Sequence, residues 1–123
     1  KIHTDTNYRK PNKNQRFCNL AFPMHGNLEN RFTFWPDLEE EDKIRCLKTS
    51  SVDDKGDMAK WLPKYLVEEK WLSKVEHKQH QPVLLNTGIP HAAKGQGTSL
   101  FAYIALLGKS FKDCIDIYDA MIR

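Results

Sequence analysis

The clearest hydrophobic pattern of the chain lies near its C-terminus. Apolar residues fill 99–107 almost without interruption, Gly108 follows, and apolar residues then recur at helical spacing over 111–123. Ser110 and Asp113 form the start of a capping box for the second segment. The pattern predicts two helices joined by a turn at Gly108. Because the first segment is apolar all round, we expect it to be the central core helix.

Two further helices are expected upstream. Asp37 can cap a segment, 37–48, whose acidic residues come first and whose basic residues come last, as the helix dipole favours. The segment 57–80 is the longest with helical periodicity, and Pro82 follows it. Pro63 inside this segment marks either a helix start or a kink.

The pattern before these helices is different. Segments 17–22 and 31–35 alternate with the period of strands and allow a small β-hairpin. Residues 1–16 are rich in Asn and Lys and contain little to bury, so we expect a flexible basic arm. Residues 17–123 are then a single globular domain. The predicted fold is mainly α, or α+β if the hairpin forms: a compact bundle of three to four helices with a C-terminal helical hairpin.

Length and composition agree with one hydrophobic core. The chain has 123 residues, of which 40% are hydrophobic and 28% charged, as in ordinary globular domains. No apolar run approaches the ~20 residues that span a bilayer, so a membrane partner is not expected. The expected core residues are Leu62, Leu66, Leu72, Leu100, Phe101, Ile104, Leu107, Phe111, Ile115, Tyr118 and Ile122.

The cysteines bear on the compartment. Cys18, Cys46 and Cys114 are an odd number without CxxC spacing, so a disulfide framework is not expected. This favours an intracellular location, in the cytoplasm or the nucleus. Cys114 falls on the apolar face of the last predicted helix and is expected to be a small core residue.

Lysines form the most distinctive candidate surface. If 57–80 is one helix, five lysines and a tryptophan fall within about one third of its circumference. Phosphates would relieve the repulsion among the lysines, and the indole could stack on a base. The residues of this lysine stripe are Lys60, Lys64, Lys70, Trp71, Lys74 and Lys78. The alternatives are a solvated helix face or a helix that lies on a membrane surface.

Two other charged segments are candidate binding surfaces. The net charge of +3 is unevenly spread, with basic and acidic segments alternating along the chain. The basic arm could reach a nucleic acid backbone through Arg9, Lys10, Lys13 and Arg16. The acidic helix could contact a protein partner through Glu39, Glu40, Glu41 and Asp42.

Metal and catalytic signals are sparse. His77 and His80 would share a helix face, with His91 in the next loop, but such a pair alone does not specify zinc. We therefore predict no metal site and no cofactor, with these three histidines as the only metal-ligand candidates. Neither a phosphate-binding glycine loop nor a signature of nucleophilic catalysis is present.

The sequence favours a non-enzymatic protein-interaction or adaptor domain with separate acidic and basic surfaces. Trp35 and Trp71 are expected to be exposed and to contact a protein partner. The alternative is an RNA- or DNA-binding domain that uses the lysine stripe and the basic arm. A small enzyme with a Cys/His site is the third hypothesis. The sequence does not indicate the oligomeric state.

Overall fold

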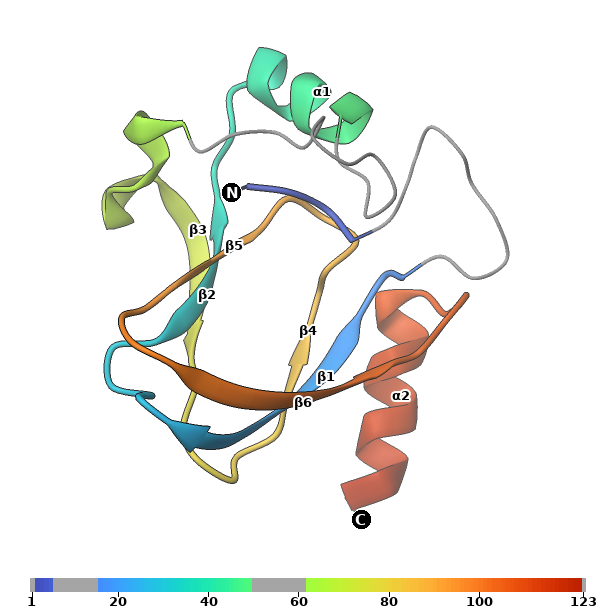
Figure 1. Cartoon of the computed structure of the whole chain (residues 1–123). Helices are drawn as coiled ribbons and strands as arrows, with labels where there is room; N and C mark the ends of the chain where they lie inside the picture. Colours follow the sequence, from blue (N-terminus) through green and yellow to red (C-terminus); the bar gives the residue numbers. More distant parts are fainter. Residues whose placement is uncertain (1, 6–15, 50–61, 123) are drawn as a thin grey trace.

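The computed structural model describes residues 2–5, 16–49 and 62–122 of the chain. The strands are β1 (Asn19–Gly26), β2 (Phe32–Pro36), β3 (Trp71–Glu76), β4 (Val83–Leu85), β5 (Ala92–Lys94) and β6 (Ser99–Ala105). The helices are α1 (Glu40–Thr49) and α2 (Phe111–Ile122), and two 3-10 turns, Pro63–Tyr65 and Glu68–Lys70, precede β3. The strands form two antiparallel three-stranded sheets, with the orders β4-β1-β6 and β3-β2-β5 (Figure 1).

The chain is therefore mostly β, and the predicted helical bundle is wrong. Residues 99–105 of the expected central helix form β6, which pairs with β1 along its length. A short, continuous apolar run does not distinguish a buried helix from a strand, and its aromatic and β-branched residues favour a strand. Phe101 is half-buried and packs against the apolar cluster between the sheets, whereas Leu100, Tyr103 and Ile104 are 62%, 58% and 46% exposed.

The predicted long helix is likewise wrong in the described part of its range. Residues 62–80 form the two 3-10 turns, β3 and the connection after it, while 57–61 lie outside the described residues. Pro63 begins the first turn, where its missing N–H is tolerated. Lysines spaced four apart share one face of a helix, but they also share one face of a strand, because four is even. The lysine pattern therefore fits both structures.

Four predicted elements are confirmed, although the hairpin is not. The helices expected over 37–48 and 111–123 are α1 and α2. The strands expected over 17–22 and 31–35 are β1 and β2, but these belong to different sheets. At the end of β1, a Cβ atom on Gly26 would lie 2.5 Å from the carbonyl oxygen of Thr98. With φ at +104°, this position requires glycine where β1 meets β6.

The main apolar core lies between the second sheet and α1. Phe34 of β2, Cys46 of α1 and Tyr65 are at most 1% exposed, and Ile2 of the N-terminal segment packs with them. Trp71 stacks on Phe34 with ring centroids 4.1 Å apart and donates its Nε1–H to the Tyr65 carbonyl at 2.8 Å. Trp71 is thus half-buried in this core, and residues at the N-terminus belong to the fold.

A smaller apolar cluster lies between the two sheets. It contains Ala21 of β1, Trp35 of β2 and Leu85 of β4. Trp35 is 9% exposed and donates its Nε1–H to the carbonyl oxygen of Asn86 at 2.8 Å, so its predicted exposure is wrong. Several expected core residues are instead exposed, namely Leu66, Leu72, Leu100, Ile104, Leu107 and Ile115.

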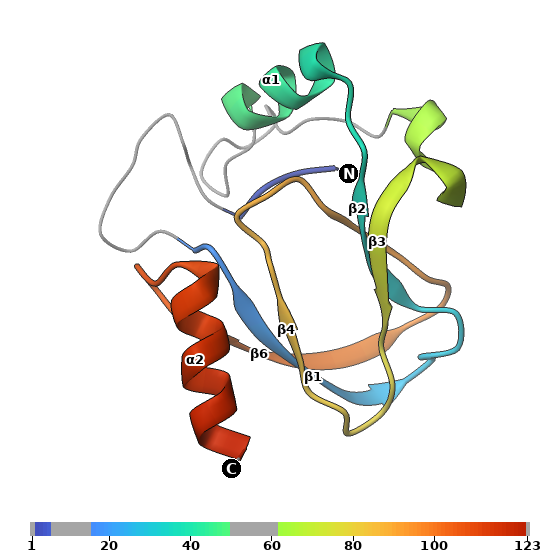
Figure 2. The same ribbon diagram turned by 180° about the vertical axis from the view of Figure 1, so that it is seen from behind.

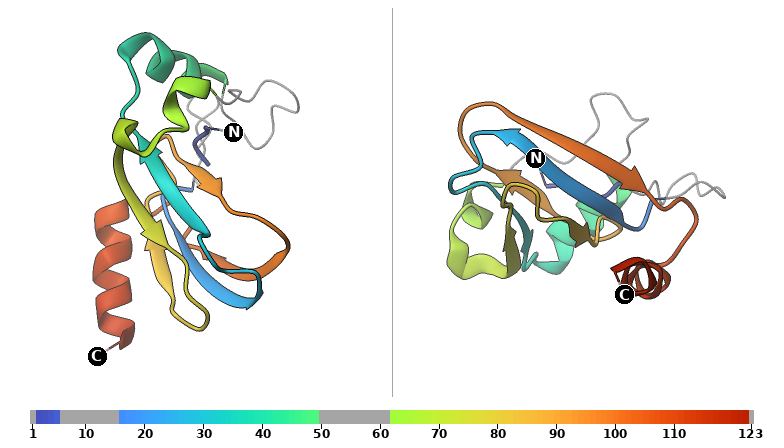
Figure 3. Two further views of the ribbon diagram at one scale, coloured as in Figure 1. Left: turned by 90° about the vertical axis from the view of Figure 1, so that its left-hand side faces the viewer. Right: turned by 90° about the horizontal axis from the view of Figure 1, so that it is seen from below.

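A disulfide attaches α2 to the first sheet. Cys18, just before β1, is bonded to Cys114 of α2, and the helix stands beside β4 at the edge of the sheet (Figures 2 and 3). The expectation of unpaired cysteines is therefore wrong for these two, and the intracellular location stays a prediction. Cys46 is free, and burial raises the pKa of its thiol to about 11. Neither described helix is long and apolar enough to cross a membrane.

Candidate metal-binding site

Two distant segments of the chain bring the candidate site together. The N-terminal segment runs antiparallel to the residues before β5, and the backbones of His3 and His91 exchange two hydrogen bonds of 3.0 and 2.9 Å. The backbone N–H of Asp5 donates to the carbonyl of Thr87 at 2.8 Å. Side chains alternate along an extended segment, so His3 and Asp5 fall on the same side of it.

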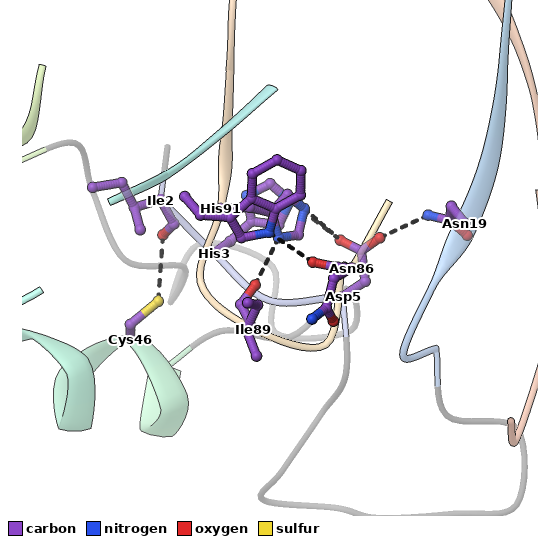
Figure 4. A network of polar contacts seen from close by, with 9 residues as sticks. Ile2, His3, Asp5, Asn19, Cys46, Asn86, Ile89 and His91 are labelled. Atoms are coloured by element: carbon purple, nitrogen blue, oxygen red, sulfur yellow. Dashed lines mark hydrogen bonds and ion pairs between the residues drawn. The ribbon is translucent and has the colours of Figure 1, made fainter. Parts of the chain in front are cut away.

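Three ligand-type side chains converge at this point (Figure 4). Asp5 Oδ1 lies 3.3 Å from His3 Nε2 and 3.5 Å from His91 Nε2. One potential ligand atom from each residue lies within 4.8 Å of the others. The second oxygen of the carboxylate, Oδ2, accepts a hydrogen bond of 2.9 Å from the Asn19 side-chain amide. Among the residues that the structure describes, this is the one group of three that could hold a metal ion.

The orientation of His91 is set by its other ring nitrogen. Nδ1 lies 2.8 Å from the carbonyl oxygen of Ile89, which can only accept, so Nδ1 carries a proton. In the neutral ring, Nε2 then holds a lone pair directed toward Asp5. His91 is 6% exposed, and burial lowers its pKa; the charge of His3 acts in the same direction, while Asp5 and the Ile89 carbonyl oppose it.

Asp5 is held in the charged form. Burial raises the pKa of its carboxyl, but the hydrogen bond from His3 and the charges of His91, His3 and Arg16 outweigh this, and the pKa is lowered. The site therefore combines one carboxylate with two imidazoles. Carboxylate oxygen and imidazole nitrogen are both ligands of zinc and of other first-row divalent metals.

A cavity of about 440 Å³ opens beside the three side chains. Arg16, Thr33, Thr87 and Tyr103 contribute to its wall, together with strands of both sheets. The hydroxyl of Thr87 is buried and has no hydrogen-bond partner among the described residues. The space between the sheets is therefore partly apolar, around Trp35, and partly a polar cavity that reaches the His3–Asp5–His91 cluster.

The lysine stripe predicted on one helix is divided among several elements. Its described members are Lys64 and Lys70 in the two 3-10 turns, Trp71 and Lys74 in β3, and Lys78 after that strand. Lys60 lies outside the described residues. The helical geometry of the stripe is wrong, while nucleic-acid binding by these residues stays a prediction.

Two lysines of the stripe are paired with acids. Lys64 Nζ lies 2.9 Å from both Glu39 Oε2 and Asp42 Oδ2, and these two hydrogen bonds raise its pKa. Lys74 pairs with Glu68, and this hydrogen bond raises the pKa of the lysine. These two cations are therefore partly neutralised within the fold.

The residues of the predicted basic arm and acidic helix also have different surroundings from one another. Arg9, Lys10 and Lys13 lie outside the described residues, while Arg16 lines the cavity. In the acidic group, Asp42 is 8% exposed and Glu39 is bonded to Lys64, whereas Glu40 and Glu41 are exposed. Glu39 precedes α1, and the other three acids form its first turn.

The three histidines named from the sequence separate in the structure. His77 is buried and bonds through Nε2 to the Thr33 hydroxyl at 2.8 Å. His80 lies in a turn with φ at +60°, and its backbone N–H donates to Pro23. Only His91 belongs to the metal-ligand cluster.

The other two members of the cluster, His3 and Asp5, were missed. They were assigned to the flexible arm, although in 2–5 the β-branched residues Ile2 and Thr4 alternate with His3 and Asp5. That alternation is the signal of a short extended segment. The comparison of this chain with family models, curated proteins and solved structures finds no match.

Proposed function

We propose that this protein binds a divalent transition-metal ion, with Zn²⁺ as the best fit, through His3, Asp5 and His91. The observation that carries the proposal is the convergence of two imidazole Nε2 atoms on one carboxylate oxygen. The atoms of these side chains that face away from the site also form hydrogen bonds. His91 Nδ1 donates to the carbonyl oxygen of Ile89, and Asp5 Oδ2 accepts from the side-chain amide of Asn19. Such outer partners orient ligands in zinc proteins.

Two of the three separations between the ligand atoms fit a tetrahedral ion. Ligand atoms about 2.0–2.1 Å from Zn²⁺ at tetrahedral angles are about 3.3 Å from one another. The two distances to Asp5 Oδ1, 3.3 and 3.5 Å, match this value. Two nitrogens and one oxygen also form a suitable donor set for zinc.

The proposed site is open, not closed. Structural zinc sites use four protein ligands, whereas catalytic sites use three and leave one position for water or substrate. Here three ligands border a cavity of about 440 Å³, which provides access to a fourth position. A zinc ion in such a site supplies a bound water whose pKa is lowered to about 7.

The functions expected from the sequence are compatible with this proposal. Protein interaction through the acidic helix and nucleic-acid binding through the basic residues both stay predictions. The exposed Glu40 and Glu41 of α1 are available to a protein partner. Neither function requires the His3–Asp5–His91 cluster, so metal binding is tested separately.

The test is a zinc titration by calorimetry of the chelator-treated protein without a histidine tag. We expect one ion per chain, and an affinity at least about 100-fold lower in His3→Ala, Asp5→Asn and His91→Ala, because losing even an outer-shell partner costs about 10–100-fold. Absorption of the Co²⁺-loaded protein in the visible region reports the geometry of the site, since tetrahedral Co²⁺ absorbs strongly.

His25→Ala is the matched control, because His25 is exposed on β1 outside the cluster. It should bind zinc like the unmodified protein. Zinc binding that survives all three cluster substitutions would place the ion elsewhere. If none of these proteins binds zinc, His3 and Asp5 form an ion pair that only fastens the N-terminal segment. Circular dichroism of each zinc-free variant identifies any that fails to fold, and the remaining variants then decide.

A further inference from the structure

A second cavity of about 350 Å³ adjoins the one beside the proposed metal site. The two share Thr33, Ala93 and Tyr103 in their walls, so they are neighbours in the space between the sheets. The second cavity also reaches Arg31, His77 and Ser99, at the end of the molecule where β5 and β6 are joined. A small molecule that extends past the three shared residues would reach both cavities.

Arg31 presents a positive charge at this second cavity. Its Nε–H donates to Asn27 O at 2.9 Å, and its Nη2 donates to Gln96 O and Gly97 O at 3.0 Å each. These carbonyls fix the guanidinium group without neutralising it. Within the described part of the chain, no carboxylate lies at ion-pair distance from Arg31.

His77 lines the same cavity and is a buried histidine whose hydrogen bonding is incomplete. The side chain is 95% buried, since its exposed fraction is 5%. Its Nε2 bonds to Thr33 Oγ1, but its Nδ1 has no hydrogen-bond partner within the described part of the chain. A buried polar group without a partner is unusual in a folded protein. Ser99 adds a hydroxyl group to the same wall.

The charge along the two cavities is positive. Among the described residues that line the second cavity, Arg31 is a cation and none is an acid, while Asp5 and Arg16 in the first cavity have opposite charges. A divalent ion at Asp5 would increase this excess. Field lines concentrate in a cavity with low-dielectric walls, so a positive cavity attracts an anionic ligand.

We propose that the second cavity binds the oxyanion group, a carboxylate or a phosphate, of a small molecule that extends toward His3, Asp5 and His91. The part of this proposal that concerns the far end of the ligand rests on the proposed metal site. The oxyanion contact does not, because Arg31 and Ser99 are present without a metal. A planar guanidinium with fixed orientation suits either oxyanion.

The experiment measures the binding of acetate and of inorganic phosphate by two-dimensional NMR of the zinc-free protein. Acetamide is the uncharged counterpart of acetate. We expect the anions, but not acetamide, to shift the backbone amide signals of Thr33 and Ser99 in a saturable manner. The relative affinities of acetate and phosphate identify the preferred oxyanion. Repeating the acetate titration with one equivalent of zinc shows whether the metal strengthens binding.

Two substitutions weaken the site in different ways. Arg31→Gln removes the cation, and Ser99→Asp adds a repelling carboxylate while leaving the carbonyl contacts of Arg31 in place. Each should weaken anion binding by about tenfold or more, since hydrogen bonds to charged groups are among the stronger ones. Ala102→Asp is the matched control, because Ala102 is exposed on the same strand and does not line either cavity.

The outcomes separate this proposal from the metal proposal. The oxyanion site is supported if the zinc-free protein binds the anions, if Arg31→Gln or Ser99→Asp weakens this binding, and if Ala102→Asp preserves it. This conclusion does not depend on the result of the zinc titration. The proposal is overturned if the anions bind only the zinc-loaded protein and no cavity substitution matters, because the anion is then simply a ligand of the metal. Absence of anion binding with and without zinc overturns it as well. If one cavity variant does not fold, the other decides.

Discussion

Asp42 and Asp5 are two shielded carboxylates with opposite surroundings. Asp42 Oδ2 accepts hydrogen bonds from the Tyr65 hydroxyl at 2.7 Å and from Lys64 Nζ at 2.9 Å, groups that hold protons in the folded protein. Asp5 Oδ1 faces the Nε2 atoms of His3 and His91, which can carry either a proton, as in the hydrogen bond from His3, or a lone pair that binds a metal. The first carboxylate is satisfied by the protein itself. The second has an arrangement that a cation between the three groups completes.

The pKa values of the two carboxyls are lowered for different reasons. The hydrogen bonds from Lys64 and Tyr65 are the largest influences on Asp42, and burial opposes them. Burial is the largest influence on Asp5 and acts in the opposite direction, but the hydrogen bond from His3 and nearby positive charges outweigh it. We infer that Asp42 is an anchor of the fold, whereas Asp5 is a ligand. This difference leads to predictions that separate stability from metal binding.

The largest expected effect on stability is at Asp42. Asp42→Ala leaves the buried Tyr65 hydroxyl without its acceptor and should lower the free energy of unfolding by about 3 kcal/mol, the upper end for an unsatisfied buried group. Zinc affinity should stay the same. Urea unfolding of the zinc-free protein measures the first quantity and calorimetry the second. Asp42→Asn, which keeps an acceptor for Tyr65, should destabilise less. A loss below about 0.5 kcal/mol in Asp42→Ala, typical of an ordinary surface substitution, would contradict the role of an anchor.

Asn19 tests the other side of the comparison. Its side-chain amide holds Asp5 Oδ2, which leaves Oδ1 directed at the histidines. Asn19→Ala should weaken zinc binding by about 10–100-fold, as loss of an outer-shell partner usually does. The unfolding free energy should change by only about 1 kcal/mol. Asn86→Ala is the control, because within the described part of the chain only the backbone carbonyl of Asn86 accepts a hydrogen bond, from Trp35, and the substitution keeps that carbonyl. Equal zinc affinity in both variants would show that Asp5 needs no support from Asn19.

The sequence predicted the elements whose pattern has one interpretation. Helix α2 was predicted within one residue of its end, because apolar residues recur at helical spacing along one face. Ser110 caps the helix, and its hydroxyl accepts a hydrogen bond of 3.1 Å from the backbone N–H of Asp113. Strand β6 was missed because a continuous apolar run fits both a helix and a strand. Residues 99–105 form a strand because they pair with β1, which is distant in the sequence, so their local pattern does not reveal this structure.

The candidate site was out of reach of sequence reasoning for a related reason. His3 and Asp5 are near one end of the chain and His91 is in its second half, and only the antiparallel contact between the two segments brings them together. Spacing rules find ligands that share a helix or a loop, as His77 and His80 were expected to do. The expectation that residues 1–16 contain little to bury is wrong for 2–5, since Ile2 and Thr4 are 1% and 0% exposed, which composition did not reveal.

His77 provides the smallest and most specific test, because it is a buried histidine like His91 but bonds to a hydroxyl. Burial, with the charge of Arg31 adding to it, lowers the pKa of His77 below its usual 6.5. As the pH falls below about 6.5, His77 is protonated in the unfolded chain before it is protonated in the folded protein. This favours the unfolded state, so stability is lost between about pH 6.5 and the lowered pKa of His77 in the folded state. Above this window the folded protein keeps its full stability with respect to this group.

His77→Gln retains a polar partner for Thr33 and removes the titration. The stability of the unmodified protein relative to this variant should therefore decline from pH 7.5 to pH 5.5, as measured by urea unfolding in the presence of a chelator. His91 contributes the same slope to both proteins and cancels in the difference. A constant difference would mean that His77 takes up its proton equally easily in the folded and unfolded states. Zinc affinity should be unaffected, because His77 lies outside the His3–Asp5–His91 cluster.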